Sequence, residues 1–353
     1  MRYLTGLSTP DEFIALGING EAYAFLSALE YDRGRKCAAK NCRVLRESDF
    51  GGPDRMKVFR SIAAEFCVDS FTVANDFPLY WADKLRNAGL TVNACGGALL
   101  PQREFKTGDE AEKLFHSEKA AEKGLLRARE VLGASSVDND DRIIYQNEVL
   151  TSEKLRAEID CELIRCGMLP TGTICAGAVQ SAQPHNPGSG TLYANTPIVI
   201  DIFPKSLASG YWGDLTRTAV KGKAPDVVKA AHRAVCEAKQ SAIAMLAIGA
   251  IPAQIHLAAE KILAEHGFFT GRTDAGDFGF FHSLGHGVGL DIHEAPRLSP
   301  RNDSPLRGGE VVTVEPGLYY PEWGGIRQED LIYLAPDGEV KNLTSLPDTL
   351  EIP

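Results

Sequence analysis

Four apolar runs typical of buried strands carry carboxylates, and this pattern constrains the fold of the chain more than any other feature. The runs are TPIVIDIF, YWGDLTRTAV, EVVTVEPGLYY and GIRQEDLIYL, and the carboxylates are Asp201, Asp214, Glu315 and Glu329. Burying a carboxylate is energetically unfavourable unless a cation, a proton or several hydrogen-bond donors lie beside it. We therefore expect these acids to share one site between the strands of a buried sheet.

The spacing of the four acids indicates two hairpin-like units. The first two are separated by a loop containing Ser209-Gly210, and the last two by a loop containing Gly324-Gly325. Both separations allow neighbouring antiparallel strands to present their carboxylates to one point, where two divalent cations would neutralise them. The alternative is that the acids are unrelated and that each pairs with a nearby base, such as Arg217 or Arg327. That alternative explains one acid well, but explains all four poorly once the histidines are considered.

The segment HSLGHGVGLDIHE, residues 282–294, contains three of the eight histidines. Gly285, Gly287 and Gly289 surround and follow His286, which excludes a helical HExxH arrangement and predicts an extended or tightly turned backbone. One imidazole would complete a set with the four carboxylates, and this mostly oxygen set suits Mn, Co, Fe or Zn. A water bridging two such metals becomes a hydroxide suited to amide hydrolysis.

Composition excludes several classes of protein. The chain has 353 residues, enough for two domains and a deep site. A net charge of −10 without a basic block argues against nucleic acid and anionic membrane as partners. The absence of a signal peptide and of an apolar run of about 20 residues predicts a cytoplasmic location. The eight scattered cysteines fit that compartment, and we expect most of them to be small buried residues.

The elements divide near residue 108. The first part predicts a small α/β domain, with a hairpin around Asn19-Gly20 and helices over PDRMKVFRSIAAEF and PLYWADKLRNAGL. A long charged helix over residues 108–133 follows, with its charges on a solvated face and Gly133 as its stop. A later helix, SEKLRAEIDCELIR, opens on Ser152 as its expected cap.

The five candidate ligands occur in the settings VIDIF, GDLTRT, SLGHGVGL, TVEPGLY and GIRQED. Their order resembles the metallopeptidase family of methionine aminopeptidase, aminopeptidase P and prolidase. The resemblance implies an α/β (α+β) fold, with a pita-bread catalytic domain over residues 108–353. A short creatinase-like amino-terminal domain over residues 1–107 would precede it, and in it RYLTGLSTPDEFIAL resembles a strand. The resemblance also implies a homodimer and two divalent metal ions, most commonly Mn.

The resemblance assigns roles to individual positions. Asp201 would bind one metal, Asp214 and Glu329 would bridge both, and His286 and Glu315 would complete the other shell. Glu315 would also carry the proton between the bridging hydroxide and the leaving amine.

Other positions would act on the substrate. His293 would donate to the substrate carbonyl, and His185 and His282 would line the substrate pocket. Tyr319 and Arg327 would orient the ligands and contribute to substrate binding. Without the resemblance, His185 could be a residue of a surface loop, His293 could cap a local turn, and Tyr319 could be an ordinary strand aromatic.

The predicted function is hydrolysis of the amino-terminal Xaa-Pro bond of a small peptide through a metal-bridging hydroxide. Prolidase activity on Xaa-Pro dipeptides is an alternative. A non-peptidase enzyme on the same fold, such as a creatine hydrolase or a sulfonium lyase, is another, as is a binding module without catalysis. The departures from the family pattern are Phe203-Pro204 at the mouth of the site and a short first domain, and both bear on substrate preference.

Overall fold

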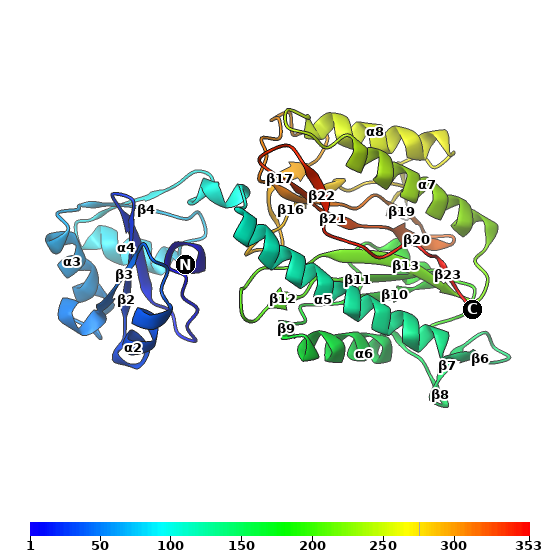
Figure 1. Cartoon of the computed structure of the whole chain (residues 1–353), viewed down its shortest axis with the longest axis horizontal. Helices are drawn as coiled ribbons and strands as arrows, with labels where there is room; N and C mark the ends of the chain where they lie inside the picture. Colours follow the sequence, from blue (N-terminus) through cyan, green and yellow to red (C-terminus); the bar gives the residue numbers. More distant parts are fainter. Residues whose placement is uncertain (275) are drawn as a thin grey trace. The chain divides into compact units, whose positions relative to one another are not determined.

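The computed structural model describes residues 1–274 and 276–353. The chain forms two compact units, Met1–Arg103 and Glu104–Pro353 (Figure 1). No helix in the described ranges is both long enough and apolar enough to cross a membrane.

The first unit is a small α/β domain around two parallel strand pairs. Its elements are α1 Arg2–Thr5, β1 Ile14–Ile18, β2 Glu21–Leu26, α2 Ala28–Cys37, β3 Cys42–Arg46, a 3-10 turn Glu47–Phe50, α3 Arg55–Glu65, β4 Ser70–Val73, α4 Leu79–Asn87 and β5 Thr91–Ala94. Strand β2 pairs antiparallel with β1 and parallel with β3, while β4 pairs parallel with β5. Phe25, Val58, Ile62 and Leu85 belong to the core that joins strands and helices.

The predicted hairpin and helices of this unit are confirmed. The turn between β1 and β2 is Asn19-Gly20, with φ values of 50° and 82°, as a two-residue type I′ turn requires. Helix α3 begins after Asp54, whose carboxylate accepts hydrogen bonds from two backbone N–H groups of the first turn. The strand expected within RYLTGLSTPDEFIAL begins only at Ile14, the first residue of β1, and Arg2–Thr5 instead forms one helical turn that Gly6 ends at φ 73°.

The second unit contains the remaining elements. They are α5 Gly108–Gly133, β6 Ser136–Val137, β7 Ile143–Tyr145, β8 Glu148–Val149, α6 Ser152–Arg165, β9 Met168–Leu169, β10 Ile174–Gly177, a 3-10 turn Ala178–Ala182, β11 Ile198–Ile202, β12 Lys205–Ser206, β13 Leu215–Lys221, α7 Asp226–Ala244, α8 Pro252–Glu265, β14 Gly271–Thr273, β15 Gly276–Phe278, β16 Gly285–Gly287, β17 Glu294–Leu298, β18 Val311–Val314, β19 Gly317–Tyr320, β20 Gly324–Arg327, β21 Asp330–Leu334, β22 Val340–Asn342 and β23 Glu351–Ile352. The 3-10 turn Pro101–Glu104 precedes α5.

Two sheets of this unit lie between two pairs of helices (Figure 1). One has the order β10-β11-β13-β23 and packs on α5 and α6 through residues such as Leu125, Ile159 and Ile200. The other has the order β17-β16-β18-β21-β22, and a core including Ala231 and Ile332 joins it to α7 and α8. Alanine on the inner face of α7 allows this close packing. The candidate ligands come from strands of both sheets.

Three details of the sequence interpretation are wrong in this unit. The charges of α5 do not all face solvent, because Glu118 and Glu122 are buried. The cap of α6 is Thr151, whose hydroxyl accepts from the N–H of Lys154, whereas the Ser152 hydroxyl has no hydrogen-bond partner. Among the eight cysteines, all of them free, Cys175 is buried and the others are partly or fully exposed.

Candidate metal centre

The first pair of predicted ligands lies on adjacent antiparallel strands. Asp201 is in β11 and pairs with Thr216 of β13, and Asp214 immediately precedes β13. Both carboxylates are buried. The prediction that this pair lies on neighbouring antiparallel strands is confirmed.

The second pair lies where one hairpin passes between two sheets. Glu315 separates β18 from β19, and Glu329 separates β20 from β21. Strands β18 and β21 pair in the five-stranded sheet, whereas β19 and β20 pair in a separate ribbon. Pairing of Val314 with Asp330 and of Gly317 with Arg327 therefore places the two glutamates in the same break.

His286 reaches this point from β16, which lies between β17 and β18. A Cβ atom on Gly285 would lie 1.9 Å from the carbonyl oxygen of Thr313, and one on Gly287 would lie 2.1 Å from that of Ala295. The glycines are thus explained by close backbone approach on both sides of an extended strand. The expected extended backbone around His286 is confirmed.

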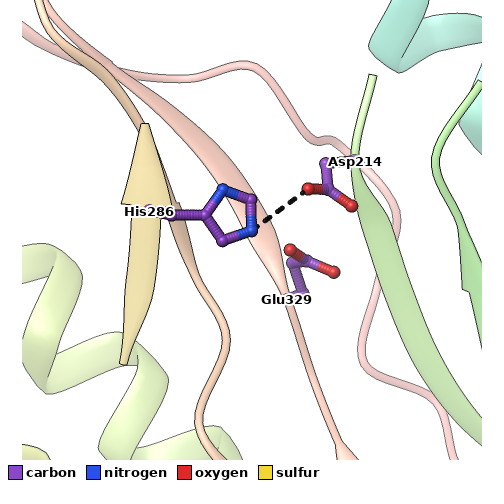
Figure 2. Close-up of side chains that lie close together, drawn as sticks. All are labelled: Asp214, His286 and Glu329. Carbon is purple, nitrogen blue, oxygen red and sulfur yellow. Dashed lines mark ion pairs between the residues drawn. The ribbon is translucent and has the colours of Figure 1, made fainter. Parts of the chain in front are cut away.

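The side chains of Asp214, His286 and Glu329 point toward one another (Figure 2). One ligand atom from each lies within 4.8 Å of the others. Nε2 of His286 is 3.6 Å from Oδ2 of Asp214 and 3.4 Å from Oε1 of Glu315. Three carboxylates from three different strand ends therefore surround one imidazole nitrogen.

The tautomer of His286 indicates which kind of group these side chains could bind. Its Nδ1 lies 3.1 Å from the carbonyl oxygen of Gly287, which can only accept, so Nδ1 carries the proton. Burial, followed by the charge of His293, lowers the pKa of His286 to about 3, and the ring is neutral. Nε2 consequently directs a lone pair at the carboxylate oxygens. Such a convergence of electron pairs fits a divalent cation, which would be bound by the nitrogen and the carboxylate oxygens together.

The pKa values of the acids agree with that interpretation. Burial and the neighbouring carboxylates raise the pKa of Asp214 and of Glu329 well above the usual range. Burial also raises the pKa of Glu315 to about 7. The protein alone supplies too little positive charge to keep all these groups ionised, and a bound cation would supply it.

Asp201 forms an ion pair and belongs to a hydrogen-bond network outside this cluster. Arg327, which is buried, donates to Oδ2 of Asp201 at 2.5 Å and to the hydroxyl oxygen of Tyr319 at 2.9 Å. The Tyr319 hydroxyl lies 3.0 Å from Nε2 of His282, whose Nδ1 faces the carbonyl of Ser283 at 2.8 Å. Because Nδ1 must donate to that carbonyl, Nε2 accepts from the tyrosine. Burial and the charge of Arg327 lower the pKa of His282 to about 3.

The other two predicted histidines lie on the exposed side of these groups. His293 stands edge-on to His286, with 4.4 Å between ring centroids, and burial lowers its pKa. His185 is solvent-exposed, yet it lies close enough for electrostatic repulsion to contribute to lowering the pKa of both His282 and His293. The adjacent carbonyl of Pro184 accepts from Arg327 at 3.2 Å. The structure thus brings the predicted substrate-side residues to one region.

Two threonines in the site have no place in the sequence prediction. The Thr216 hydroxyl donates to Oε2 of Glu329 at 2.6 Å, and that of Thr313 donates to Oε1 of Glu315 at 3.3 Å while accepting from the N–H of His286 at 3.0 Å. Each follows or precedes a ligand by two positions, the period of one strand face. That period is a signal by which the sequence could have revealed them.

A third missed residue, Glu118, accepts a hydrogen bond from the N–H of Asp214 at 3.0 Å across 96 positions of sequence. No pattern in the sequence near either residue predicts such a contact.

Residues 113–336 match the model of Metallopeptidase family M24. The chain belongs to that family. A Pyrococcus horikoshii protein named Xaa-Pro dipeptidase is 38% identical over 173 residues, which make up 49% of this chain and 46% of that protein. The chain spans about half the length of the curated relatives it matches.

Two solved structures of similar overall fold cover nearly the whole chain. Prolidase from Pyrococcus furiosus has a TM-score of 0.80 at 24% identity, covering 98% of this chain and 94% of that one. X-Pro aminopeptidase from Thermotoga maritima has a TM-score of 0.81 at 23% identity, covering 99% and 92%. The M24 chain therefore has the predicted mixed α/β pita-bread fold with an amino-terminal domain, and the predicted family and fold are confirmed.

Proposed function

We propose that this chain is a dinuclear metal-dependent exopeptidase that hydrolyses the amino-terminal Xaa-Pro bond of small peptides. The observation that carries the proposal is the convergence of buried acids on the unprotonated Nε2 of His286. The relatives support the substrate class, since their names include both Xaa-Pro dipeptidase and X-Pro aminopeptidase. Removal of one residue from longer peptides is the main proposal, and cleavage of dipeptides is the second candidate, which the curated dipeptidases favour.

Five side chains would hold the two metal ions: Asp201, Asp214, His286, Glu315 and Glu329. With four carboxylates and one imidazole the donor set is rich in oxygen, which supports Mn as the first choice, with Co, Zn or Fe as alternatives. When bound, the ions would supply Lewis acidity, lowering the pKa of a water and polarising the scissile carbonyl.

Glu315 is proposed to move the proton. Its carboxylate accepts from the Thr313 hydroxyl and lies beside His286, so its orientation is set by two neighbours. From there it would accept a proton from the attacking water and return it to the leaving nitrogen of the proline.

The remaining residues would bind and orient the peptide. His293, the exposed neighbour of His286, would donate to the substrate carbonyl as charge develops on its oxygen. His282 and His185 would line the pocket. Tyr319 and Arg327 would hold His282 and Asp201 in place, consistent with their shared hydrogen bonds. A homodimer, a cytoplasmic location and domain limits at residues 107 and 108 remain predictions.

The test is hydrolysis of Xaa-Pro dipeptides, Xaa-Pro-Xaa tripeptides and a Met-Ala-Xaa tripeptide by metal-stripped protein resupplied with Mn, Co or Zn. Glu315→Gln and His286→Ala are assayed beside matched controls, Glu112→Gln and His116→Ala, which alter exposed residues of α5. We expect metal-dependent cleavage before proline that both site variants abolish and both controls retain.

The ratio of tripeptide to dipeptide turnover decides between the two candidate substrates. Two metal ions bound without cleavage of any peptide would refute the peptidase proposal and favour a non-peptidase reaction on this fold.

A further inference from the structure

Helix α5 packs directly against residues 211–214, the segment that contains Asp214. The Ser117 hydroxyl donates to the carbonyl of Tyr211 at 3.0 Å. A Cβ atom on Gly213 would lie 2.5 Å from the carbonyl oxygen of Ser117, so this glycine allows the segment to touch the backbone of the helix. The next residue on the helix, Glu118, then contacts the next residue of the segment.

The carboxylate of Glu118 joins two parts of the chain. Its Oε2 accepts from the N–H of Asp214 at 3.0 Å, and its Oε1 accepts from the Thr344 hydroxyl at 2.6 Å. The Thr344 oxygen in turn accepts from the N–H of Leu331 at 2.9 Å, two positions after Glu329. Glu118 is fully buried and is paired with no cationic side chain among these contacts.

We propose that Glu118 is a positioning residue of the metal centre. It fixes the backbone of Asp214 directly and, through Thr344, fixes the strand that begins after Glu329. The inference rests on the proposed metal site, since both attached residues are candidate bridging ligands. Groups that orient metal ligands affect metal affinity even though they do not touch the ion.

A carboxylate is the side chain that these contacts require. Both of its oxygens accept, one from an N–H group and the other from an O–H group. Glutamine has the same shape but offers one acceptor and one donor, so it can keep the contact with the N–H of Asp214 only by donating to the Thr344 oxygen, and the Thr344 hydroxyl proton then loses its acceptor. Glu118→Gln therefore removes the charge and disturbs the Thr344 contact without removing volume from the core.

Glu122 provides a matched control on the same helix. It is buried one turn further along and accepts from the N–H and the hydroxyl of Ser345, the neighbour of Thr344. Its hydrogen bonds are with Ser345 and Lys119 and not with Asp214. Glu122→Gln therefore disturbs the attachment of the same segment to α5 while leaving the Asp214 contact in place.

The experiment measures Mn²⁺ binding by calorimetry and the visible absorption spectrum of the Co²⁺-loaded full chain, beside the melting temperature of the metal-free protein. The variants are Glu118→Gln, Glu122→Gln, Thr344→Val and Thr344→Ser. We expect Glu118→Gln to weaken Mn²⁺ binding about 10- to 100-fold and to change the Co²⁺ spectrum. Thr344→Val should weaken binding in the same direction, while Thr344→Ser and Glu122→Gln should match wild type in both readouts.

Wild-type Mn²⁺ affinity and an unchanged Co²⁺ spectrum in folded Glu118→Gln would overturn the inference. If that variant does not fold, the Thr344 pair decides: equal affinities for the valine and serine variants overturn it, and weaker binding by the valine variant alone supports it. Equal weakening by Glu122→Gln would also overturn it, because the effect would then be general to the helix. Absence of metal binding by the wild-type chain would refute the metal centre itself.

Discussion

Replacing Arg327 should reveal how much of the site's stability depends on one guanidinium group. Arg327→Met removes the charge that faces Asp201 and the donors to Tyr319 and Thr216, at 2.5, 2.9 and 3.2 Å respectively. All of these groups are buried, so solvent cannot replace the lost partner. Removing one member of a buried ion pair destabilises a protein by about 3 to 5 kcal/mol. For a unit of this size that corresponds to a fall in melting temperature of roughly 6 to 20 °C.

The assay is calorimetric unfolding of the metal-free protein, with and without added Mn²⁺. We expect the loss to be smaller with the metal, because a cation near Asp201 replaces part of the missing positive charge. Arg142→Met is the control, since Arg142 pairs with Asp138 at the surface, where an ion pair contributes about 0 to 1 kcal/mol. A melting temperature of metal-free Arg327→Met equal to that of the control would refute the reasoning that Asp201 depends on this guanidinium.

Three further predictions concern single positions. His256 accepts a hydrogen bond from the backbone N–H of Leu284 in the core, and burial lowers its pKa below 6.5. Protonation therefore favours the unfolded state. The contribution of neutral His256 to the free energy of unfolding is fully present above the unfolded-state pKa and decreases as the pH falls below it. Urea titrations between about pH 7.5 and 5.5 should show a smaller pH dependence in His256→Gln. Gly287→Ala should displace β16 and abolish tight Mn²⁺ binding, since its Cβ would lie 2.1 Å from a carbonyl oxygen; retained affinity would contradict the tight fit. Asp54→Ala should destabilise the protein by about 1 kcal/mol in denaturant unfolding, and no change would mean that its cap is dispensable.

Much of the site could be predicted because its signals are local. A carboxylate in an otherwise apolar strand is conspicuous, and the order of such residues with a glycine-flanked histidine is specific enough to indicate the family. The turn at Asn19-Gly20 was predictable for the same reason, because both residues tolerate positive φ. In each case the residues that identify the feature are separated by only a few positions in the sequence.

The errors come from contacts between distant segments. The charges on α5 have the appearance of a solvated face, yet Glu118 is buried because segments around Asp214 and Thr344 supply its donors. Thr151 and Ser152 are both residue types that cap helices, so the sequence does not show at which of the two the helix begins. Cysteine burial likewise depends on which helix face meets the sheet, and Cys161 lies on the outer face of α6.

The hairpin that passes from the five-stranded sheet into a separate ribbon places Glu315 and Glu329 at its bend and residues 321–323 at its tip. Pro321 and Glu322 at that tip are exposed, whereas the strands on either side of the bend are buried. The candidate metal ligands and the exposed turn therefore occupy opposite ends of one structural unit. A change of length or composition at the exposed tip should leave the strand pairing on both sides of the bend in place, and with it the register of the two glutamates.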